Sequence, residues 1–268
     1  MWDESAWEAL VGAWVYASPS REARALERRA VVSSIEDLLE GQGFTVASVG
    51  DASAPTLVAR RAATSGGASI AVYNHYDVEP AGAGWSTEPR RLTLREGRYY
   101  GRGVADNLGA LALRLLATRD ARSAPEILWV IEGEEELGSP SLSAVRTETA
   151  ARRPAMWVDE TGFFESPRAQ RLLSVNGDDG VAARAIDAIT GRAALHGVTV
   201  ATESRRMNRV SPDGRTSVES LMDGVAYLAL GPNDADARIH RADESLPRWS
   251  LRLSAEQWVE LLEALGGR

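Results

Sequence analysis

The sequence predicts an α/β fold in which a mostly parallel sheet is flanked by helices. Short apolar runs typical of buried strands alternate along the chain with segments whose apolar residues recur at helical spacing. This alternation is characteristic of parallel sheets that carry helices on both faces. The length of 268 residues allows one large domain or two small ones. Because no long linker interrupts the pattern, we expect a single domain over residues 1–268.

The first forty residues are expected to form two helices. Apolar residues recur at helical spacing from Trp7 to Trp14 and from Leu26 to Leu39, and Gly41 ends the second stripe. Further helices are predicted over Asn107–Thr118, Ser139–Ala150, Ala182–Ile189 and Ala255–Leu265. Strands are predicted over Phe44–Val49, Thr56–Ala59, Ser69–Tyr73, Glu126–Ile131, Ala155–Val158, Gly197–Ala201 and Val225–Leu230.

The composition excludes several classes of function. The chain contains no lysine, which rules out Schiff-base lysines, pyridoxal enzymes and P-loop NTPases. It also contains no cysteine, so disulfides, thiol nucleophiles, iron–sulfur clusters and cysteine-ligated zinc are excluded. A formal net charge of -8 argues against nucleic acid as a partner.

Targeting and membrane signals are not predicted. The first five residues are acidic, whereas a secretory signal begins with positive charge. Charged residues interrupt every apolar stretch well before the roughly 18 residues that a membrane span needs. We therefore expect a cytoplasmic protein with no membrane partner.

Histidines and carboxylates follow the predicted strands. Ligands of open α/β sheets bind beyond the carboxyl ends of the strands. Five strand ends or their loops carry such residues, namely His75 with Asp77, Asp106, Glu132 with Glu134 to Glu136, Asp159 with Glu160, and His240. Imidazole and carboxylate together suit zinc or another first-row divalent ion. A bridging carboxylate would let such a set hold two ions about 3.5–4 Å apart.

Each of these residues also has a purely structural explanation. A run of glutamates is usually a solvated face, Asp106 and Asp159 can cap helices, and His240 can be an ordinary loop residue. Their ordered occurrence at successive strand ends favours the metal site. Asp77 lies two residues after His75, on the same side of an extended segment, where it can accept the second ring N–H.

Several segments resemble the M20 metallopeptidases, a family that includes dipeptidases, carboxypeptidases, aminoacylases and amino-acid deacylases. The resemblance covers most of the chain in order, and its wording is closest to the dipeptidase branch. The segments are His75–Pro80, Trp85–Pro89 and Gly101–Gly109, which resemble the metal-binding region, Glu135–Ser139, which resembles a Glu-Glu-x-Gly-Ser signature, and Gly231-Pro232 with His240–Glu244, which resemble the C-terminal segment.

The resemblance implies a zinc-exopeptidase-like catalytic domain that holds two divalent metal ions, which we expect to be zinc. Asp106 would bridge the two ions. His75 and Asp159 would complete one site. Glu136 and His240 would complete the other.

The resemblance also implies the chemistry. Glu135 would be the general base, and Asp77 would orient His75. A metal-activated water would cleave a peptide or N-acyl amide bond of a small or carrier-bound amino-acid substrate. We therefore expect a hydrolase of the dinuclear metallopeptidase or amidohydrolase class.

Two features depart from the family pattern. Leu108 stands where the family has a lysine in Asp-x-Lys-Gly. The interval from Asp159 to His240 is too short for the lid domain that family members usually insert, and we expect a turn near 176–180 in its place. Without a lid, no segment of this sequence evidently supplies the dimer contacts and substrate-binding residues that the lid provides in the family. We therefore expect a monomer with an open site, closed by a protein partner or carrier if it is closed at all.

Two alternatives remain open at this stage. One is a metalloenzyme of the same fold redirected to biosynthetic chemistry such as amide formation. The other is a non-catalytic binding module that kept the fold. Retention of Glu135 and of the whole ligand set favours an enzyme.

Overall fold

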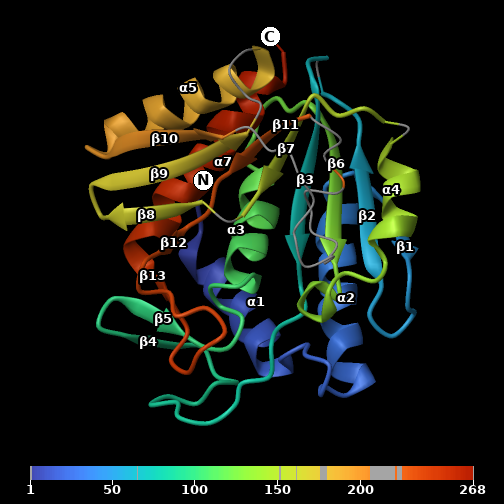
Figure 1. Ribbon diagram of the computed structural model, residues 1–268, viewed down its shortest axis with the longest axis vertical. Coiled ribbons are helices and arrows are strands. Elements are labelled where there is room, and N and C mark those ends of the chain that lie inside the picture. The colour runs from blue at the N-terminus through green and yellow to red at the C-terminus, as the bar shows by residue number, and fades with distance from the viewer. Residues whose placement is uncertain are drawn as a thin grey trace.

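A mixed sheet forms the centre of the protein in the computed structural model (Figure 1), which describes residues 2–64, 66–150, 152–160, 162–175, 180–205, 221 and 225–267. In this part of the chain the sheet has ten strands in the order β1-β2-β6-β3-β7-β11-β9-β8-β12, with β10 paired to β9. Its strands are β1 (Thr45–Val49), β2 (Thr56–Arg61), β3 (Ser69–His75), β6 (Glu126–Glu132), β7 (Met156–Asp159), β8 (Phe163–Ser166), β9 (Ala169–Val175), β10 (Thr199–Arg205), β11 (Ala226–Ala229) and β12 (Asn233–Asp234). A small second sheet contains β4 (Thr93–Arg95), β5 (Arg98–Tyr100) and β13 (Ser245–Pro247).

The centre of the large sheet is parallel. Strand β3 lies between β6 and β7 and is parallel to both, and β11 is parallel to β7. The pairings of β1 with β2 and of β2 with β6 are antiparallel, as is the pairing of β9 with β11. The prediction of a mostly parallel sheet flanked by helices is confirmed. As a consequence, the carboxyl ends of β3, β6, β7 and β11 meet at one edge of the sheet.

The helices are α1 (Glu4–Ala17), α2 (Ala25–Glu40), α3 (Leu108–Thr118), α4 (Leu142–Ala150), α5 (Gly180–Leu195) and α7 (Arg248–Leu265), with a short 3₁₀ helix η1 (Glu135–Leu137). Each long predicted helix is therefore present, although α5 continues six residues beyond its expected end at Ile189 and α7 begins seven residues before its expected start at Ala255. Helix α1 begins where Asp3 Oδ1 accepts a hydrogen bond from the Ala6 N–H at 3.1 Å, an N-cap that satisfies one of the free amides of the first turn.

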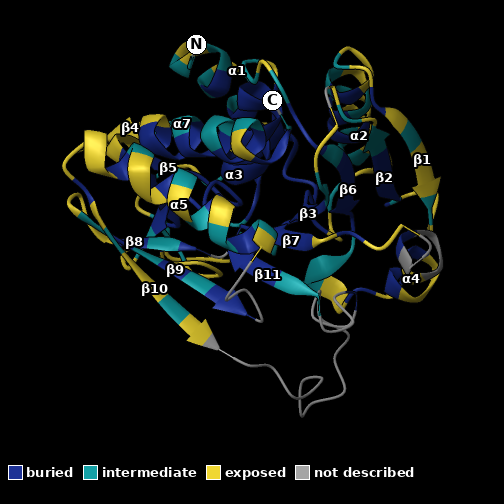
Figure 2. Ribbon diagram, turned by 90° about the horizontal axis from the view of Figure 1, so that it is seen from above, coloured by how far each residue is buried: buried dark blue, intermediate teal, exposed yellow. Residues whose placement is uncertain are grey.

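Helices cover both faces of the sheet, as the buried strands between them show in Figure 2. Successive residues of a strand point to opposite faces. In β3, Ile70 and Val72 join the large core beneath α1, α2, α3 and α7, whereas Ala71 and Tyr73 join a second core that contains Leu142 of α4. The near-continuous apolar runs of β3 and β6 are the pattern expected of strands buried on both faces.

Arg114 of α3 fastens the strand ends together. Its buried guanidinium donates hydrogen bonds to the Tyr73 carbonyl at 3.2 Å and to the Asn74 side chain at 3.1 Å, at the end of β3. The other terminal nitrogen donates to the carbonyls of Asp159 at 2.8 Å and Leu230 at 2.7 Å, which follow β7 and β11. One side chain thus connects the ends of three neighbouring strands.

Replacing Arg114 by methionine is expected to lower the free energy of unfolding by about 3 kcal/mol or more, because several buried oxygens lose their donor at about 1–3 kcal/mol each. Chemical denaturation measures the effect. The matched control is Arg119→Met, which removes an exposed arginine just beyond the end of the same helix. If Arg114→Met lowered the free energy of unfolding no more than the control does, the hydrogen bonds of Arg114 would not be needed to hold the strand ends together.

The predicted turn near 176–180 lies almost wholly outside the described residues. Only Gly180 is described, and it is the first residue of α5. No helix in the described ranges combines the length and the apolar character that crossing a bilayer requires.

Candidate metal centre

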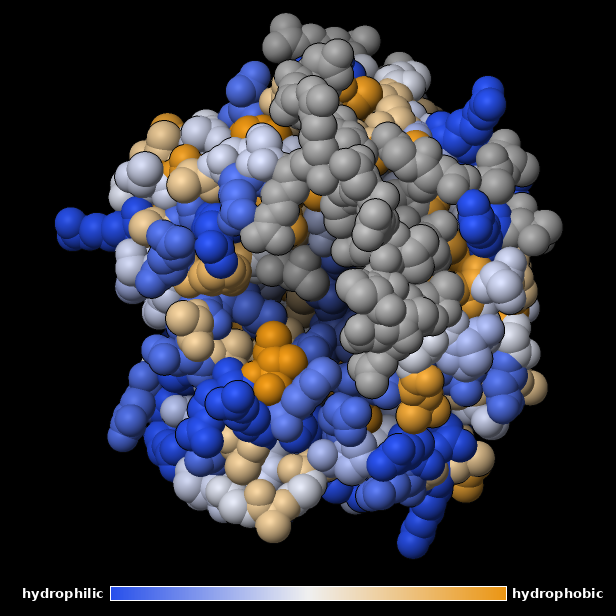
Figure 3. Space-filling view, in the orientation of Figure 1, coloured by the Kyte–Doolittle hydropathy of each residue, from blue (hydrophilic) through white to orange (hydrophobic). Residues whose placement is uncertain are grey.

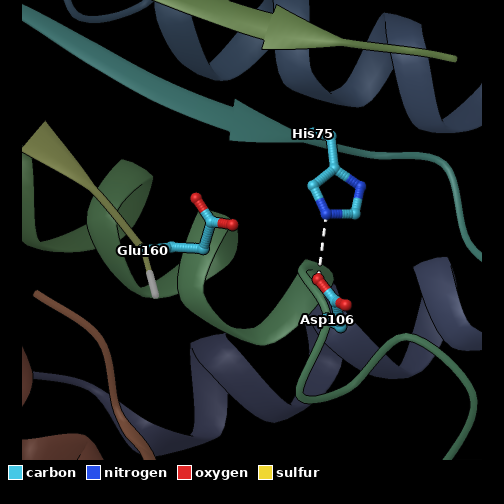
Figure 4. Close-up of side chains that lie close together, drawn as sticks. All are labelled: His75, Asp106 and Glu160. Carbon is cyan, nitrogen blue, oxygen red and sulfur yellow. Dashed lines mark hydrogen bonds and ion pairs between the residues drawn. The ribbon is translucent and has the colours of Figure 1, made fainter. Parts of the chain in front are cut away.

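His75, Asp106 and Glu160 meet at the carboxyl edge of the sheet (Figure 4). His75 is the last residue of β3, Glu160 follows β7 directly, and Asp106 lies two residues before α3. One ligand atom of each lies within 4.8 Å of the others. His75 Nε2 is 2.9 Å from Asp106 Oδ1. Three segments that are far apart in sequence therefore present one nitrogen and two carboxylates to a common point.

A second group shares Asp106 with the first. Asp106, Glu136 and His240 also offer atoms within 4.8 Å of one another. His240 Nε2 lies 3.2 Å from Asp106 Oδ2 and 3.1 Å from Glu136 Oε1. Asp106 thus directs one carboxylate oxygen to each histidine. This is the arrangement that a carboxylate bridging two cations requires.

Asp77 connects His75 to the glutamates of η1. Its two carboxylate oxygens accept hydrogen bonds from the backbone N–H groups of Glu135 and Glu136, at 3.2 and 3.0 Å. Oδ1 of Asp77 also lies 3.4 Å from His75 Nδ1, the ring nitrogen that faces away from Asp106. The same buried carboxylate therefore holds the start of η1 and lies against the predicted ligand histidine.

Glu160, and not the predicted ligand Asp159, lies with His75 and Asp106. The carboxylate of Asp159, the predicted ligand, accepts hydrogen bonds from the Glu160 N–H and from the Tyr227 hydroxyl. Glu160 is the member of the His75 and Asp106 group instead. Its buried Oε2 has no hydrogen-bond partner in the described part of the chain. In the ladder of β7 and β11, Asp159 lies opposite Ala229, two residues from Tyr227 and on the same face, so its carboxylate meets the Tyr227 hydroxyl and the next residue faces the site.

The electrostatics of the site are dominated by its histidines and carboxylates. Burial opposes the charged form of His75, but hydrogen bonds to Asp106 and Asp77 outweigh it and raise the pKa of the imidazole well above its usual range. Hydrogen bonds to Asp106 and Glu136 raise the pKa of His240 to about 10. Burial would raise the pKa of Asp106, yet the contacts with both histidines lower it. Burial raises the pKa of Glu135.

The donor set fits divalent metal ions. Within the described ranges, none of the carboxylates of Asp106, Glu135, Glu136 and Glu160 forms a salt bridge with an arginine. Buried carboxylates without a compensating cation are costly, and the unpaired Oε2 of Glu160 is such a case. Mixed imidazole and carboxylate ligands suit zinc and related ions. A divalent ion at this place would satisfy the Glu160 oxygen that the described residues leave unpaired.

Glu244, to which the sequence assigned no role, connects the loops of two predicted ligands. Its fully buried carboxylate accepts hydrogen bonds from the backbone N–H groups of Gly103, Ala105 and Asp106, at 2.9 to 3.0 Å. It also pairs with Arg102 at 2.6 Å. Because Glu244 lies four residues after His240, it ties the loop of one predicted ligand to the loop of the other.

Fold and site together describe an α/β domain with a candidate metal centre at the carboxyl edge of its sheet. Residues 71–264, most of the chain, match the model of peptidase family M20/M25/M40. The chain belongs to this metallopeptidase family, and the resemblance described from its motifs is confirmed.

Similar proteins include dipeptidases and a deacylase. Human beta-Ala-His dipeptidase is 36% identical over 95 residues, which are 33% of this chain and 19% of that protein. Succinyl-diaminopimelate desuccinylase of Acidiphilium cryptum is 36% identical over 100 residues, 37% of this chain and 26% of that protein. The Cys-Gly metallodipeptidase dug1 of Schizosaccharomyces pombe is 27% identical over 179 residues, which are 60% of this chain and 37% of that protein. The alignments thus span well under half the length of these relatives.

Solved structures share the fold. Human carnosine dipeptidase 1 superposes with a TM-score of 0.74 at 13% identity, over 98% of both chains. The dipeptidase Dug1p of Saccharomyces cerevisiae superposes with a TM-score of 0.77 at 12% identity, over 98% of this chain and 96% of that chain. At such low identity the likeness establishes the architecture.

Proposed function

We propose that this protein is a metal-dependent hydrolase that cleaves a peptide or N-acyl amide bond of an amino-acid substrate with the help of two divalent ions. The observation that carries the proposal is the position of Asp106 between the two histidines, with Oδ1 2.9 Å from His75 Nε2 and Oδ2 3.2 Å from His240 Nε2. Membership of the M20 family supports the same class of reaction.

The proposed ligands follow from the two groups that share Asp106. His75 and Glu160 would complete one site, with Glu160 in the place predicted for Asp159. Glu136 and His240 would complete the other. Zinc is the proposed metal because it accepts nitrogen and oxygen ligands in tetrahedral or five-coordinate sites.

Glu135 is the proposed general base. When bound, divalent ions lower the pKa of a water molecule and polarise the carbonyl of the scissile bond. Glu135 lies beside His75 and Glu136, and burial raises the pKa of its carboxyl, which suits a group that must take up a proton and release it. It would accept the proton of the attacking water and deliver it to the leaving nitrogen. Asp77 would hold Glu135 in position through the backbone N–H.

Metal binding is expected to release protons. In the metal-free protein at pH 7 both ligand histidines carry a proton, since the pKa of His75 is raised well above its usual range and that of His240 to about 10. A histidine that binds a metal must be neutral, so at least about two protons should leave as about two ions bind; burial raises the pKa of the Glu160 carboxyl, which adds to this release. Calorimetric titration with zinc in buffers of different ionisation enthalpy measures both numbers.

Two variants make the titration specific. His240→Gln should remove about one proton and one ion from the stoichiometry. His196→Gln, which changes a histidine paired with Glu256 beyond the end of α5, should leave both unchanged. Binding of a single ion without proton release by the unaltered protein would contradict the proposed pair of sites.

The absence of an inserted lid is also part of the proposal. Only residues 176–179 separate β9 from α5. By the resemblance to the family, this is the place in the chain where a lid domain would be inserted. We infer a single catalytic domain whose site is open on the side of His240, the most exposed of the proposed ligands.

The activity itself is tested by incubating the zinc-loaded protein with a panel of dipeptides and N-acyl amino acids and measuring the free amine. The proposal predicts release of amine that stops when the metal is removed by a chelator. Tight metal binding with no turnover of any substrate would favour a redirected metalloenzyme or a binding module.

A further inference from the structure

A pocket of about 240 Å³ opens directly beside the candidate metal centre. Asp106 and Glu160 of the candidate metal centre line it, and Phe163, Ala235 and Ile239 supply apolar side chains to its lining. Figure 3 shows this side of the molecule, where the surface is hollowed near the centre. Because the pocket shares two residues with the metal centre, a substrate whose scissile bond lies at that centre would place a neighbouring group in the pocket.

The pocket has room for one side chain of ordinary size. A protein cavity of about 150 Å³ that is lined by apolar residues takes up benzene. The volume here is therefore sufficient for a phenyl group or a branched aliphatic group. Ile239 is partly exposed, so the apolar lining extends to the mouth of the pocket.

The pocket lining offers an acidic group no free cation among the described residues. Three carboxylates line it, those of Asp106, Glu160 and Asp234. In the proposed enzyme Asp106 and Glu160 would hold the metal ions, which leaves Asp234. Arg98 already holds Asp234 through two hydrogen bonds of 2.6 and 2.8 Å, so it is not available to a substrate carboxylate.

The cation that touches Phe163 is also engaged. Arg171 lies over the Phe163 ring, 4.2 Å from its centroid. Its guanidinium forms ion pairs with Glu165 at 3.9 Å and with Glu203 at 3.7 Å. Phe163 therefore contributes an apolar ring to the pocket. The charge of Arg171 is balanced by Glu165 and Glu203.

Asn233 is a buried part of the pocket wall. Its side-chain Nδ2 donates to the Ala105 carbonyl at 3.0 Å, and its buried Oδ1 has no partner in the described ranges. The residue is 8% exposed. It therefore supplies no charge that would attract a substrate carboxylate.

We propose that this pocket binds an aliphatic or aromatic substituent next to the scissile bond, so that the enzyme prefers apolar side chains to acidic ones at that position. The inference rests on the proposed function and deepens it by naming the class of substrate. Phe163 and Ile239 are the residues that would determine this specificity. Neither belongs to the proposed metal ligands or to the proposed base.

Four dipeptides test the proposal, Leu-Ala, Asp-Ala, Ala-Leu and Ala-Asp, because they place each side chain on either side of the scissile bond. For the unaltered enzyme, kcat/KM should favour leucine over aspartate by about 10-fold or more on at least one side. Phe163→Ala and Ile239→Ala should each reduce this ratio several-fold. The control Leu195→Ala removes an exposed apolar side chain at the end of α5 and should leave the ratio unchanged.

A binding measurement separates the pocket from the reaction. The zinc-loaded Glu135→Gln variant should bind N-acetyl-leucine more tightly than N-acetyl-aspartate, and the difference should disappear when Ile239→Ala is added. A preference for aspartate on both sides of the bond, or ratios that neither pocket variant changes, would overturn the inference. Selective binding of N-acetyl-leucine without any turnover would support the proposed preference of the pocket and would overturn the proposed function instead.

Discussion

Replacing Glu135 by glutamine is expected to lower kcat by about 10²- to 10⁴-fold, the usual contribution of a general base. Glutamine has nearly the shape of glutamate but cannot accept the proton of the attacking water. The backbone N–H that Asp77 holds is retained in the variant, so η1 should keep its position. The two ions should remain bound, because Asp106 and the two histidines are unaltered. Steady-state kinetics and metal analysis of the same preparation measure both results.

The adjacent residue provides the matched control. Glu134 precedes η1, and its carboxylate accepts a hydrogen bond from Ser141. Glu134→Gln should therefore retain most of the activity. If Glu135→Gln lost an ion together with its activity, Glu135 would be a ligand, a role that its distance from His75 and Glu136 also permits. An unchanged kcat would remove Glu135 from the mechanism.

Replacing Glu244 by alanine is expected to destabilise the protein by about 3–5 kcal/mol, because it leaves the buried Arg102 guanidinium without its partner. The change also removes the acceptor of three backbone N–H groups, including that of Asp106. The loop that carries the proposed bridging carboxylate would then lose its fixed distance from His240. We therefore expect weaker metal binding in addition to the lower stability.

Chemical denaturation of the metal-free protein isolates the stability effect, and zinc titration of the folded variant isolates the effect on the site. Asp243→Ala is the appropriate control, since Asp243 is the preceding residue and its carboxylate accepts its hydrogen bonds from Ser86 near the surface. Equal stability of the two variants would show that the buried Glu244 pair does not hold the loops together.

The sequence was sufficient to predict the architecture and the family. Apolar runs such as those of β3 and β6 are buried on both faces, so their pattern alone identifies strands and places His75 at the end of one of them. The hairpin of β8 and β9 was not predicted. Strand β9 alternates partly exposed and buried positions, β8 ends in exposed residues, and polar residues such as Glu165 and Arg171 give the strands a composition that resembles that of a loop.

The details of the site depend on contacts that a sequence does not display. Asp159 and Glu160 are adjacent carboxylates at a strand end, and only the neighbouring β11, with its Tyr227 hydroxyl, distinguishes them. The motif that contains Glu244 was recognised, but its partners lie near Asp106, well over a hundred residues earlier in the chain. Local pattern indicates which residue types gather at the edge of the sheet. Tertiary packing decides which oxygen points to which neighbour.

The central claim is that Asp106 lies between two metal ions. A crystal of the zinc-loaded protein, measured on both sides of the zinc absorption edge, tests it directly. The account predicts two anomalous peaks about 3.5–4 Å apart, one next to His75 and Glu160 and the other next to Glu136 and His240, with Asp106 in contact with both. A single peak, or peaks that do not contact Asp106, would contradict it.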